Sequence, residues 1–251
     1  MKAKYIDSMG SDLTCVNAAR VSFDSISTEL SKKDINLIKF LARGCMSKEW
    51  DTVIHDLYED VAMTYEDIEN TLKWAKNMPT HWSPFAHAMI TVRETVPIFV
   101  ARQRFKHTVG FAYNEISRRY VDDTPKFYYP REWRARPEGS VKQGSGDMVV
   151  DSFSKYPNTW GCKNLYEELM DEIMNAYRYM LDKGVAPEQA RMILPQSMYT
   201  EYYVTGSLAA WARAYIQRSD SHAQSEIQEL ASQWDNIIKP LFPVSWEALT
   251  K

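Results

Sequence analysis

The chain has 251 residues, of which 45% are hydrophobic and 25% are charged, and its formal net charge is -3 at pH 7. This composition is typical of a globular protein and excludes a disordered or fibrous chain. The small negative charge gives no overall signal of nucleic-acid binding, and no stretch approaches the roughly 18 apolar residues of a membrane-spanning helix.

The cysteines Cys15, Cys45 and Cys162 lie far apart and form no CxxC pair. This spacing predicts neither a disulfide framework nor a zinc site, and we expect no metal site. The first twenty residues contain no apolar run of signal-peptide length. We therefore expect a cytoplasmic protein that is neither exported nor embedded in a membrane.

The first hundred residues predict two amphipathic helices and one strand. Residues 33–43 carry apolar side chains at helical spacing. A second helix is expected from Thr64, which precedes Asp67 by three positions as in a capping box, to just before Pro79. Over 87–96, apolar and polar residues alternate, which predicts a half-buried strand.

Pro97 follows this strand and suits the first turn of a helix over 98–105. A short strand is expected at 126–130, whereas residues 131–147 are polar and rich in Gly, Pro and Ser, which predicts a mobile surface loop. Later elements are helices at about 163–183, at about 187–196 and from near Ser221, and a strand at 199–207. No repeat or linker divides the chain, so we expect a single α+β domain over residues 1–251.

Residues 102–120, with the sequence RQRFKHTVGFAYNEISRRY, form a basic cluster. They contain five Lys or Arg and one His, and Glu115 is the only acid. Arginine binds phosphate through two parallel hydrogen bonds, hydroxyl and backbone N–H groups complete such sites, and aromatic rings stack on a base. The cluster fits a nucleotide-sized ligand; the alternative is a solvated basic surface with its aromatic residues in the core.

A second motif, QRSDSHAQSEIQ, covers residues 217–228. His222 and Glu226 are four positions apart, so we expect them on one helical face, with Asp220 or Ser221 as the N-cap. A metalloprotease would need a second His four residues from the first, which is absent. The motif is either part of a functional site or simply a capped helix start with an intrahelical pair.

A third motif, HWSPFAHAMI, covers residues 81–90. It is interpreted either as a loop that presents Ser83 to a ligand or as a proline turn with packed aromatic residues. Neither a GxGxxG nor a GxxxxGKS loop occurs, so any flavin or nucleotide binds without those loops.

Taken together, these segments resemble the flavin-dependent thymidylate synthases. The motifs that carry the resemblance occur in the family's order, and they are NAARVSFDS, HWSPFAH, PIFVARQRFKH, YNEISRRY, ARMILP and RSDSHAQSEIQ. The similarity covers nearly the whole chain apart from 131–160, which we interpret as a variable loop or insertion. It implies an α+β fold with a central, mostly antiparallel sheet flanked by helices.

The family signature is Arg-His-Arg, followed after seven or eight residues by Ser. This chain reads Lys106-His107-Thr108 and, after eight residues, Ser117. Lys106 keeps one positive charge but lacks the two-pronged guanidinium, and Thr108 carries no charge. The signature is therefore a divergent one.

Two further departures concern charge. The family commonly has an aromatic residue at the position of Arg104, and it has Asn-x-Arg where this chain has Ser207-Leu208-Ala209. Arg213 lies one helical turn further on. We hypothesise that Arg104 and Arg213 restore the charge that the signature has lost.

The resemblance also implies roles for individual residues. Arg218 is expected to lie against the pyrimidine ring as the catalytic residue. The residues expected to bind dUMP are Gln103, Arg104, Lys106, Glu115, Ser117, Arg119 and Arg191. Those expected to bind FAD are Ser83, Lys106, His107, Thr108, Asn114, Glu115, Ser207 and Arg213.

The implied activity is the reductive methylation of dUMP to dTMP without an enzyme nucleophile. Methylenetetrahydrofolate would donate the carbon, and FAD reduced by NADPH would supply the hydride. A homotetramer with shared active sites is implied as well. The alternatives are a related pyrimidine-nucleotide methyl- or hydroxymethyltransferase on the same fold, and a single-stranded nucleic-acid-binding protein, against which the net charge argues.

Overall fold

The computed structural model describes residues 1–43, 64–76, 81–121, 123–136, 145–146, 148–150 and 161–251. A four-stranded antiparallel sheet with the strand order β1-β2-β4-β3 lies at its centre. The strands are β1 (Lys2–Met9), β2 (Met89–Pro97), β3 (Phe111–Glu115) and β4 (Tyr199–Ser207). The predicted α+β class, with an antiparallel sheet flanked by helices, is confirmed.

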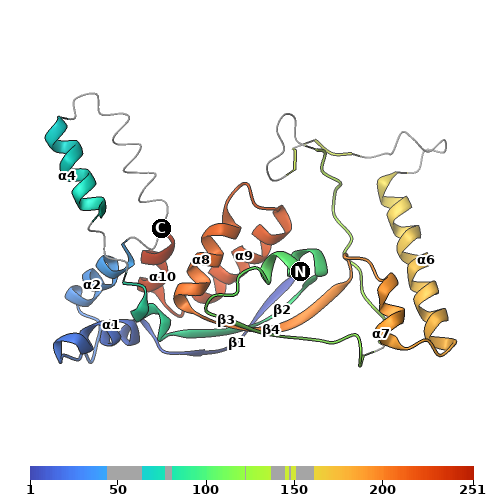
Figure 1. Cartoon of the computed structure of the whole chain (residues 1–251), viewed down its shortest axis with the longest axis horizontal. Coiled ribbons are helices and arrows are strands. Elements are labelled where there is room, and N and C mark those ends of the chain that lie inside the picture. Colours follow the sequence, from blue (N-terminus) through green and yellow to red (C-terminus); the bar gives the residue numbers. More distant parts are fainter. Residues whose placement is uncertain (44–63, 77–80, 122, 137–144, 147, 151–160) are drawn as a thin grey trace.

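The helices are α1 (Asp12–Arg20), α2 (Lys32–Ala42), α4 (Tyr65–Lys76), α5 (Ile98–Arg104), α6 (Cys162–Asp182), α7 (Pro187–Ala190), α8 (Leu208–Ser219), α9 (Ser225–Ile238) and α10 (Pro243–Thr250). Three short 3-10 turns are η1 (Val21–Phe23), η2 (Ser83–Ala86) and η3 (Arg191–Ile193). In Figure 1, α8 and α9 lie over the sheet, α1, α2 and α10 gather at one end, and α6 and α7 lie at the other. No helix in the described ranges is long and apolar enough to cross a membrane.

The two long central strands bury alternate side chains. On one face of the sheet, Val92, Val96 and Val204 are fully buried and belong to a core that includes α8 and α9. Side chains of the opposite parity point to the other face, where Arg93 is 44% and Tyr203 46% exposed. The core therefore lies between one face of the sheet and the helices that pack on it (Figure 1).

Most elements with strong periodicity lie where the sequence predicts them. The helix predicted at 33–43 begins at Lys32, where Ser31 and Asp34 form a capping box. The capping box of Thr64 and Asp67 is also present at the start of α4. The predicted end of α4 near Pro79 lies outside the described residues. β2, α5, α6 and β4 match their predictions within one or two residues.

Two predicted elements differ from the structure. The strand expected at 126–130 is reduced to one isolated bridge, between Phe127 and Met198. The helix expected at 187–196 ends at Ile193, since Leu194 precedes a proline and adopts an extended conformation.

The described part of the predicted loop at 131–147 also contains an antiparallel bridge, which joins Arg134 to Val149. Residues 137–144 and 147 of this loop lie outside the described residues. Two interpretations stay predictions: that residues 131–160 are a variable loop or insertion, and that residues 1–251 form a single domain.

Candidate functional site

The candidate site forms where the turn between α5 and β3 meets the start of α8. Gly110 in this turn has a φ of +80°, a left-handed conformation that favours glycine. Its carbonyl accepts a hydrogen bond of 3.1 Å from the backbone N–H of Ser207. A Cβ added to Gly110 would lie 2.9 Å from the Cβ of Ala210 and 3.2 Å from the Ser207 hydroxyl. The turn and the helix are therefore in direct contact.

Arg218 lies in the last turn of α8, where it contacts His107 of the same turn between α5 and β3. The guanidinium Nε of Arg218 donates to Nε2 of His107 at 2.8 Å, and its Nη2 donates to the backbone oxygen of Gln103 at 3.2 Å. The side chain of Gln103 in turn donates to Oε1 of Gln224 at 2.5 Å. Three predicted site residues, Gln103, His107 and Arg218, therefore lie together. Gln224 was missed, and its only sequence signal was its place within the 217–228 motif.

The electrostatics of the pair follow from burial and from neighbouring cations. Burial lowers the pKa of His107 to about 4, and the positive charges of Arg218, Arg104 and Arg213 contribute in the same direction. The imidazole is therefore neutral near pH 7, and its Nε2 is free to accept a hydrogen bond. Burial, followed by the charge of Arg104, lowers the pKa of Arg218, although an arginine stays protonated in proteins. The site holds a fixed cation against a neutral ring.

The divergent signature lies on the outside of the turn. Its two altered residues, Lys106 and Thr108, are exposed, and so is Asn114 on the neighbouring β3. Arg213 is also exposed, and its Nη2 donates to the backbone oxygen of Val109 at 2.8 Å. Arg213 therefore brings a positive charge to the turn that carries the altered signature residues. The other predicted cofactor residue here, Ser207, is buried and caps α8 through a hydrogen bond from the N–H of Ala210 at 3.2 Å.

Arg104 lies elsewhere than predicted. Its side chain is 0% exposed and is enclosed in the core, where its Nε lies 3.4 Å from a carboxylate oxygen of Glu94. The sequence predicted a substrate contact on a basic surface, but the aromatic residues around Arg104 close it off from solvent. This burial argues against the predicted contact with the nucleotide.

The remaining predicted substrate residues lie in separate groups. Glu115, at the end of β3, accepts a hydrogen bond of 2.5 Å from Thr200. Ser117 accepts from the backbone and the side chain of Arg119 at 3.3 and 3.5 Å. Arg191 is exposed on η3. Among the described residues, no hydrogen bond joins these groups to Arg218.

Ser83 is exposed on η2, a turn that packs against α1 and α8. Phe85, in the same turn, is fully buried. The buried Phe85 fits the proline turn with packed aromatic residues, and the presentation of Ser83 to a ligand stays a prediction.

The helix predicted from near Ser221 begins later than expected, at Ser225. α8 ends before Asp220, whose carboxylate accepts a hydrogen bond of 2.7 Å from the backbone N–H of His222 and closes a tight turn. α9 begins only after Gln224, which is its N-cap in place of the predicted Asp220 or Ser221. The prediction that His222 and Glu226 share a helical face is therefore wrong.

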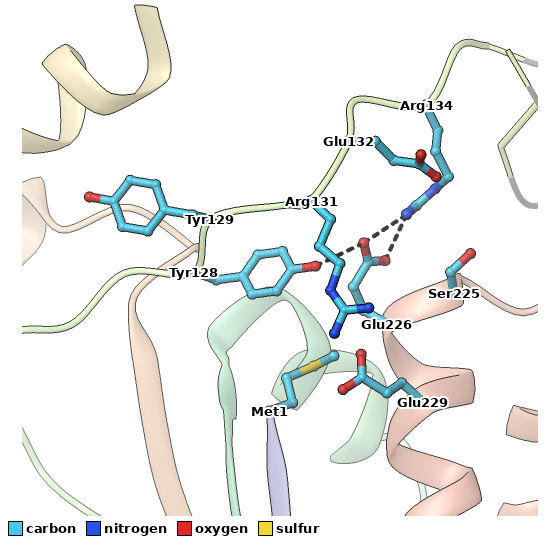
Figure 2. Close-up of a pocket in the computed structure, with 9 residues that line it drawn as sticks. All are labelled: Met1, Tyr128, Tyr129, Arg131, Glu132, Arg134, Ser225, Glu226 and Glu229. Atoms are coloured by element: carbon cyan, nitrogen blue, oxygen red, sulfur yellow. Dashed lines mark hydrogen bonds and ion pairs between the residues drawn. The ribbon is translucent and has the colours of Figure 1, made fainter. Parts of the chain in front are cut away.

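A cavity of about 440 Å³ lies at the start of α9. Figure 2 shows Glu226 in its wall, where it accepts hydrogen bonds from Arg134 at 2.7 and 2.9 Å and lies 3.4 Å from the Tyr128 hydroxyl. Burial acts to raise the pKa of Glu226, but the hydrogen bonds from Arg134 lower it overall. The ion pair therefore fastens the segment that carries Tyr128 and Arg134 to the start of α9. Within the described ranges, no group of three or more His, Cys, Asp or Glu could hold a metal ion.

Comparison with known proteins identifies the family. The chain matches the Thy1 family, described as thymidylate synthase complementing protein, over residues 4–244. The flavin-dependent thymidylate synthase of Thermosipho africanus is 32% identical over 248 residues, which cover 99% of this chain and 90% of the relative. That of Thermus thermophilus is 31% identical over 245 residues, which cover 98% of this chain and 74% of the relative.

The fold is also shared with a nucleotide methylase of known structure. The crystal structure of the UMP/dUMP methylase PolB from Streptomyces cacaoi bound with 5-Br dUMP matches with a TM-score of 0.71 and 27% identity, covering 99% of this chain and 94% of PolB. Its complex with 5-Br UMP matches with a TM-score of 0.69 and 25% identity. The chain belongs to the Thy1 family of flavin-dependent thymidylate synthases, as its motifs predicted.

Proposed function

We propose that the protein catalyses the reductive methylation of dUMP to dTMP, with methylenetetrahydrofolate as carbon donor and FAD, reduced by NADPH, as hydride source. The observation that carries this proposal is the setting of Arg218. Two acceptors, Nε2 of His107 and the oxygen of Gln103, fix its guanidinium, while Nη1 makes no hydrogen bond within the described ranges. A fixed cation with an available N–H group can stabilise negative charge that develops on a pyrimidine ring.

The nucleotide is held, in this proposal, by Gln103, Lys106, Glu115, Ser117, Arg119 and Arg191. The Arg119 guanidinium and the Ser117 hydroxyl lie next to each other, which suits a phosphate group. Gln103 lies against Arg218 and suits the base or sugar.

We infer that the protein works as a homotetramer with shared active sites. Arg191 follows α7, which lies at the opposite end of the molecule from α10 and well away from α8 (Figure 1). Arg119 is exposed beyond the end of β3. Residues that bind one small nucleotide from such separate places are brought together most simply when they come from different copies of the chain.

The residues at the signature turn fit a flavin cofactor. Lys106 and Arg213 supply two accessible positive charges, which suit a pyrophosphate, and Thr108 and Asn114 supply exposed polar groups. We infer that FAD is held by these residues together with Ser83, His107, Glu115 and Ser207. When bound, FAD supplies the hydride that reduces the transferred one-carbon unit.

The two cysteines in the described part of the chain support a mechanism without an enzyme nucleophile. Cys15 and Cys162 are buried, and burial raises the pKa of the Cys15 thiol to about 12. Such a thiol is not a nucleophile near pH 7. Arg218 therefore acts by electrostatic stabilisation, and His107 acts as the acceptor that orients it. We place this activity in the cytoplasm.

The test is the mass of the nucleotide product when purified protein is given dUMP, methylenetetrahydrofolate and NADPH, with and without added FAD. A FAD-dependent gain of one methylene unit is expected. A hydroxymethyl product would replace the proposal with the related transferase. Binding that rises with strand length and falls steeply with salt, without any product, would favour the single-stranded nucleic-acid alternative.

A second candidate function is the methylation of UMP. The observation that favours it is the structural likeness to PolB, which has been crystallised with both 5-Br dUMP and 5-Br UMP. Presenting equal concentrations of the two nucleotides in one reaction distinguishes the candidates, because the ratio of methylated products equals the ratio of kcat/KM values.

A further inference from the structure

Arg104 places a positive charge at the centre of the apolar core. Its guanidinium carbon lies 4.3 Å from the ring centre of Phe111, 4.7 Å from that of Trp211 and 4.8 Å from that of Trp234. Glu94 on β2 is also 0% exposed and lies 3.4 Å from Nε. The rings of Phe111, Trp211 and Trp234 and the carboxylate of Glu94 therefore enclose the Arg104 guanidinium, and we call this arrangement the box.

Stability alone does not account for this box. The attraction within a buried ion pair often fails to repay the cost of removing both charges from water, and an apolar pair of similar volume is often as stable. In addition, Nη2 of Arg104 is buried without a hydrogen-bond partner in the described part of the chain. An unpartnered buried donor adds a further desolvation cost. A charge that is kept under these conditions points to a role beyond packing.

The box is connected to the candidate site through Tyr113. Nη1 of Arg104 donates to the Tyr113 hydroxyl at 2.6 Å, and this hydroxyl donates to the backbone oxygen of His107 at 2.7 Å. The backbone N–H of His107 also donates to the carbonyl of Arg104 at 3.1 Å. Arg104 therefore holds the His107 peptide from both sides, through its side chain and through its own backbone.

Charged and titratable groups face His107 from several elements. Arg213 and Arg218 come from α8, and Arg104 comes from α5. Glu94 lies behind Arg104 and is held by hydrogen bonds from Tyr202 at 2.6 Å and from Trp234 at 2.8 Å. The cations therefore act on the imidazole directly, and the carboxylate is engaged elsewhere.

We propose that Arg104 is a positioning residue that keeps His107 a neutral hydrogen-bond acceptor and thereby sets the orientation of Arg218 toward the nucleotide. The charge of Arg104 disfavours a second positive charge on the ring, and the Tyr113 bridge fixes where the ring stands. The expected effect of Arg104 on turnover rests on the proposed function. Its expected effect on the protonation of His107 does not, because that protonation can be measured in the protein without ligands.

The direct test is NMR titration of histidine labelled with ¹⁵N, in the protein without ligands, with His107→Gln to assign the signal. The double variant Arg104→Met, Glu94→Gln removes both buried charges and leaves an amide oxygen for Tyr202 and Trp234. We expect the pKa of His107 to rise by several tenths of a unit in this variant, because the charge of Arg104 ranks after burial and Arg218 among the causes that lower it. It should stay below the ordinary value, because burial and Arg218 remain. The acid limb of the kcat profile should move to higher pH with it.

Tyr113→Phe is the matched variant, because it keeps the charge of Arg104 and removes only the bridge. We expect its His107 pKa to stay low, while kcat falls about tenfold and the Kd for dUMP changes little, as for a loss of orientation. A fall in affinity equal to the fall in kcat would contradict the positioning role.

The proposal is overturned if the double variant folds cooperatively and His107 titrates as in the wild type. If the double variant does not fold, Arg104→Gln combined with Glu94→Gln decides, because it removes both charges and keeps a donor for the Tyr113 hydroxyl. A His107 pKa above that of the wild type supports the proposal, and a wild-type pKa overturns it. If the enzyme forms no dTMP, the titrations still report on Arg104, so the two failures are distinguishable.

Discussion

Arg218 donates the hydrogen on Nε to Nε2 of His107 at 2.8 Å, so its guanidinium is oriented by a ring that must itself be uncharged. An imidazolium has hydrogen on both nitrogens and cannot accept this bond. The pKa of about 4 for His107 means that the acceptor is in place at neutral pH. The geometry of the guanidinium therefore depends on the protonation of its neighbour.

Arg218→Lys should reduce kcat far more than it weakens dUMP binding. Lysine keeps a positive charge but cannot donate in a fixed plane to both His107 and the Gln103 carbonyl. We expect kcat to fall by about 10²–10³-fold, the usual effect of losing one donor to developing charge, with the Kd for dUMP within about threefold. Steady-state kinetics and calorimetry measure the two. Arg178→Lys, an exposed position on α6, is the matched control, and equal losses in kcat and affinity would contradict the catalytic role.

His107 should make the free energy of unfolding depend on pH in an acid window. The unfolded chain protonates this ring near the ordinary value of 6.5, whereas the folded protein does so only near 4. Stability is therefore complete above about pH 6.5 and is lost as the pH falls toward 4. We expect a loss of about 1–2 kcal/mol, less than the full linkage value because the ring is partly exposed.

Urea unfolding at several pH values between about 4 and 8 measures this loss, with His107→Gln as the control. The variant lacks the titrating ring, so the difference between it and the wild type should shrink as the pH falls. A constant difference across the range would show that His107 titrates normally in the folded protein.

Gly110→Ala should disrupt the turn between α5 and β3, where we propose that FAD binds. The new Cβ would face the Cβ of Ala210 at 2.9 Å in a residue with a φ of +80°. We expect a destabilisation of about 2–3 kcal/mol and at least a tenfold weaker binding of FAD. Gly184→Ala is the matched control, because its φ is +81° but its Cβ would meet nothing within 4 Å. It should cost about 1 kcal/mol from backbone strain and leave FAD binding unchanged.

Arg213→Ala tests whether this residue replaces the charge that the signature lacks. Because Lys106 alone would then face the cofactor phosphates, we expect the Kd for FAD to rise about tenfold, or about 1.4 kcal/mol. Flavin fluorescence on titration measures it. Arg102→Ala is the control, since Arg102 is equally exposed on α5 but precedes the turn. An unchanged Kd in Arg213→Ala would end the compensation hypothesis.

Local periodicity predicted the elements that bury one clear stripe of residues. The residues of β2 alternate, and α2 carries its apolar residues at helical spacing with a capping box, so a short window of sequence was sufficient. β3 was missed because Phe111–Glu115 is short and follows a cluster of charges that drew a functional interpretation instead. Its strand conformation depends on the pairing with β4, which no local window contains.

The candidate site was predicted in its members but not in its arrangement. The motifs indicated Gln103, His107 and Arg218 by resemblance, whereas the bonds that join them span more than a hundred residues. Arg104 was expected to bind dUMP because it belongs to the basic cluster, but its side chain is buried. The burial of Arg104 depends on its ion pair with Glu94. The alternation of β2 predicts that Glu94 faces inward, but it does not indicate which residue pairs with it.

Ser207 is both the last residue of β4 and the N-cap of α8, so no loop separates the central strand from the helix that carries Arg218. A slip of one residue between β4 and β2 would exchange the buried and exposed faces of the strand and turn α8 away from the signature turn. A chain with a misregistered sheet therefore has no assembled site. Turnover in this protein serves as a functional readout of correct strand pairing, and recovery of activity after refolding would report how many chains found the native register.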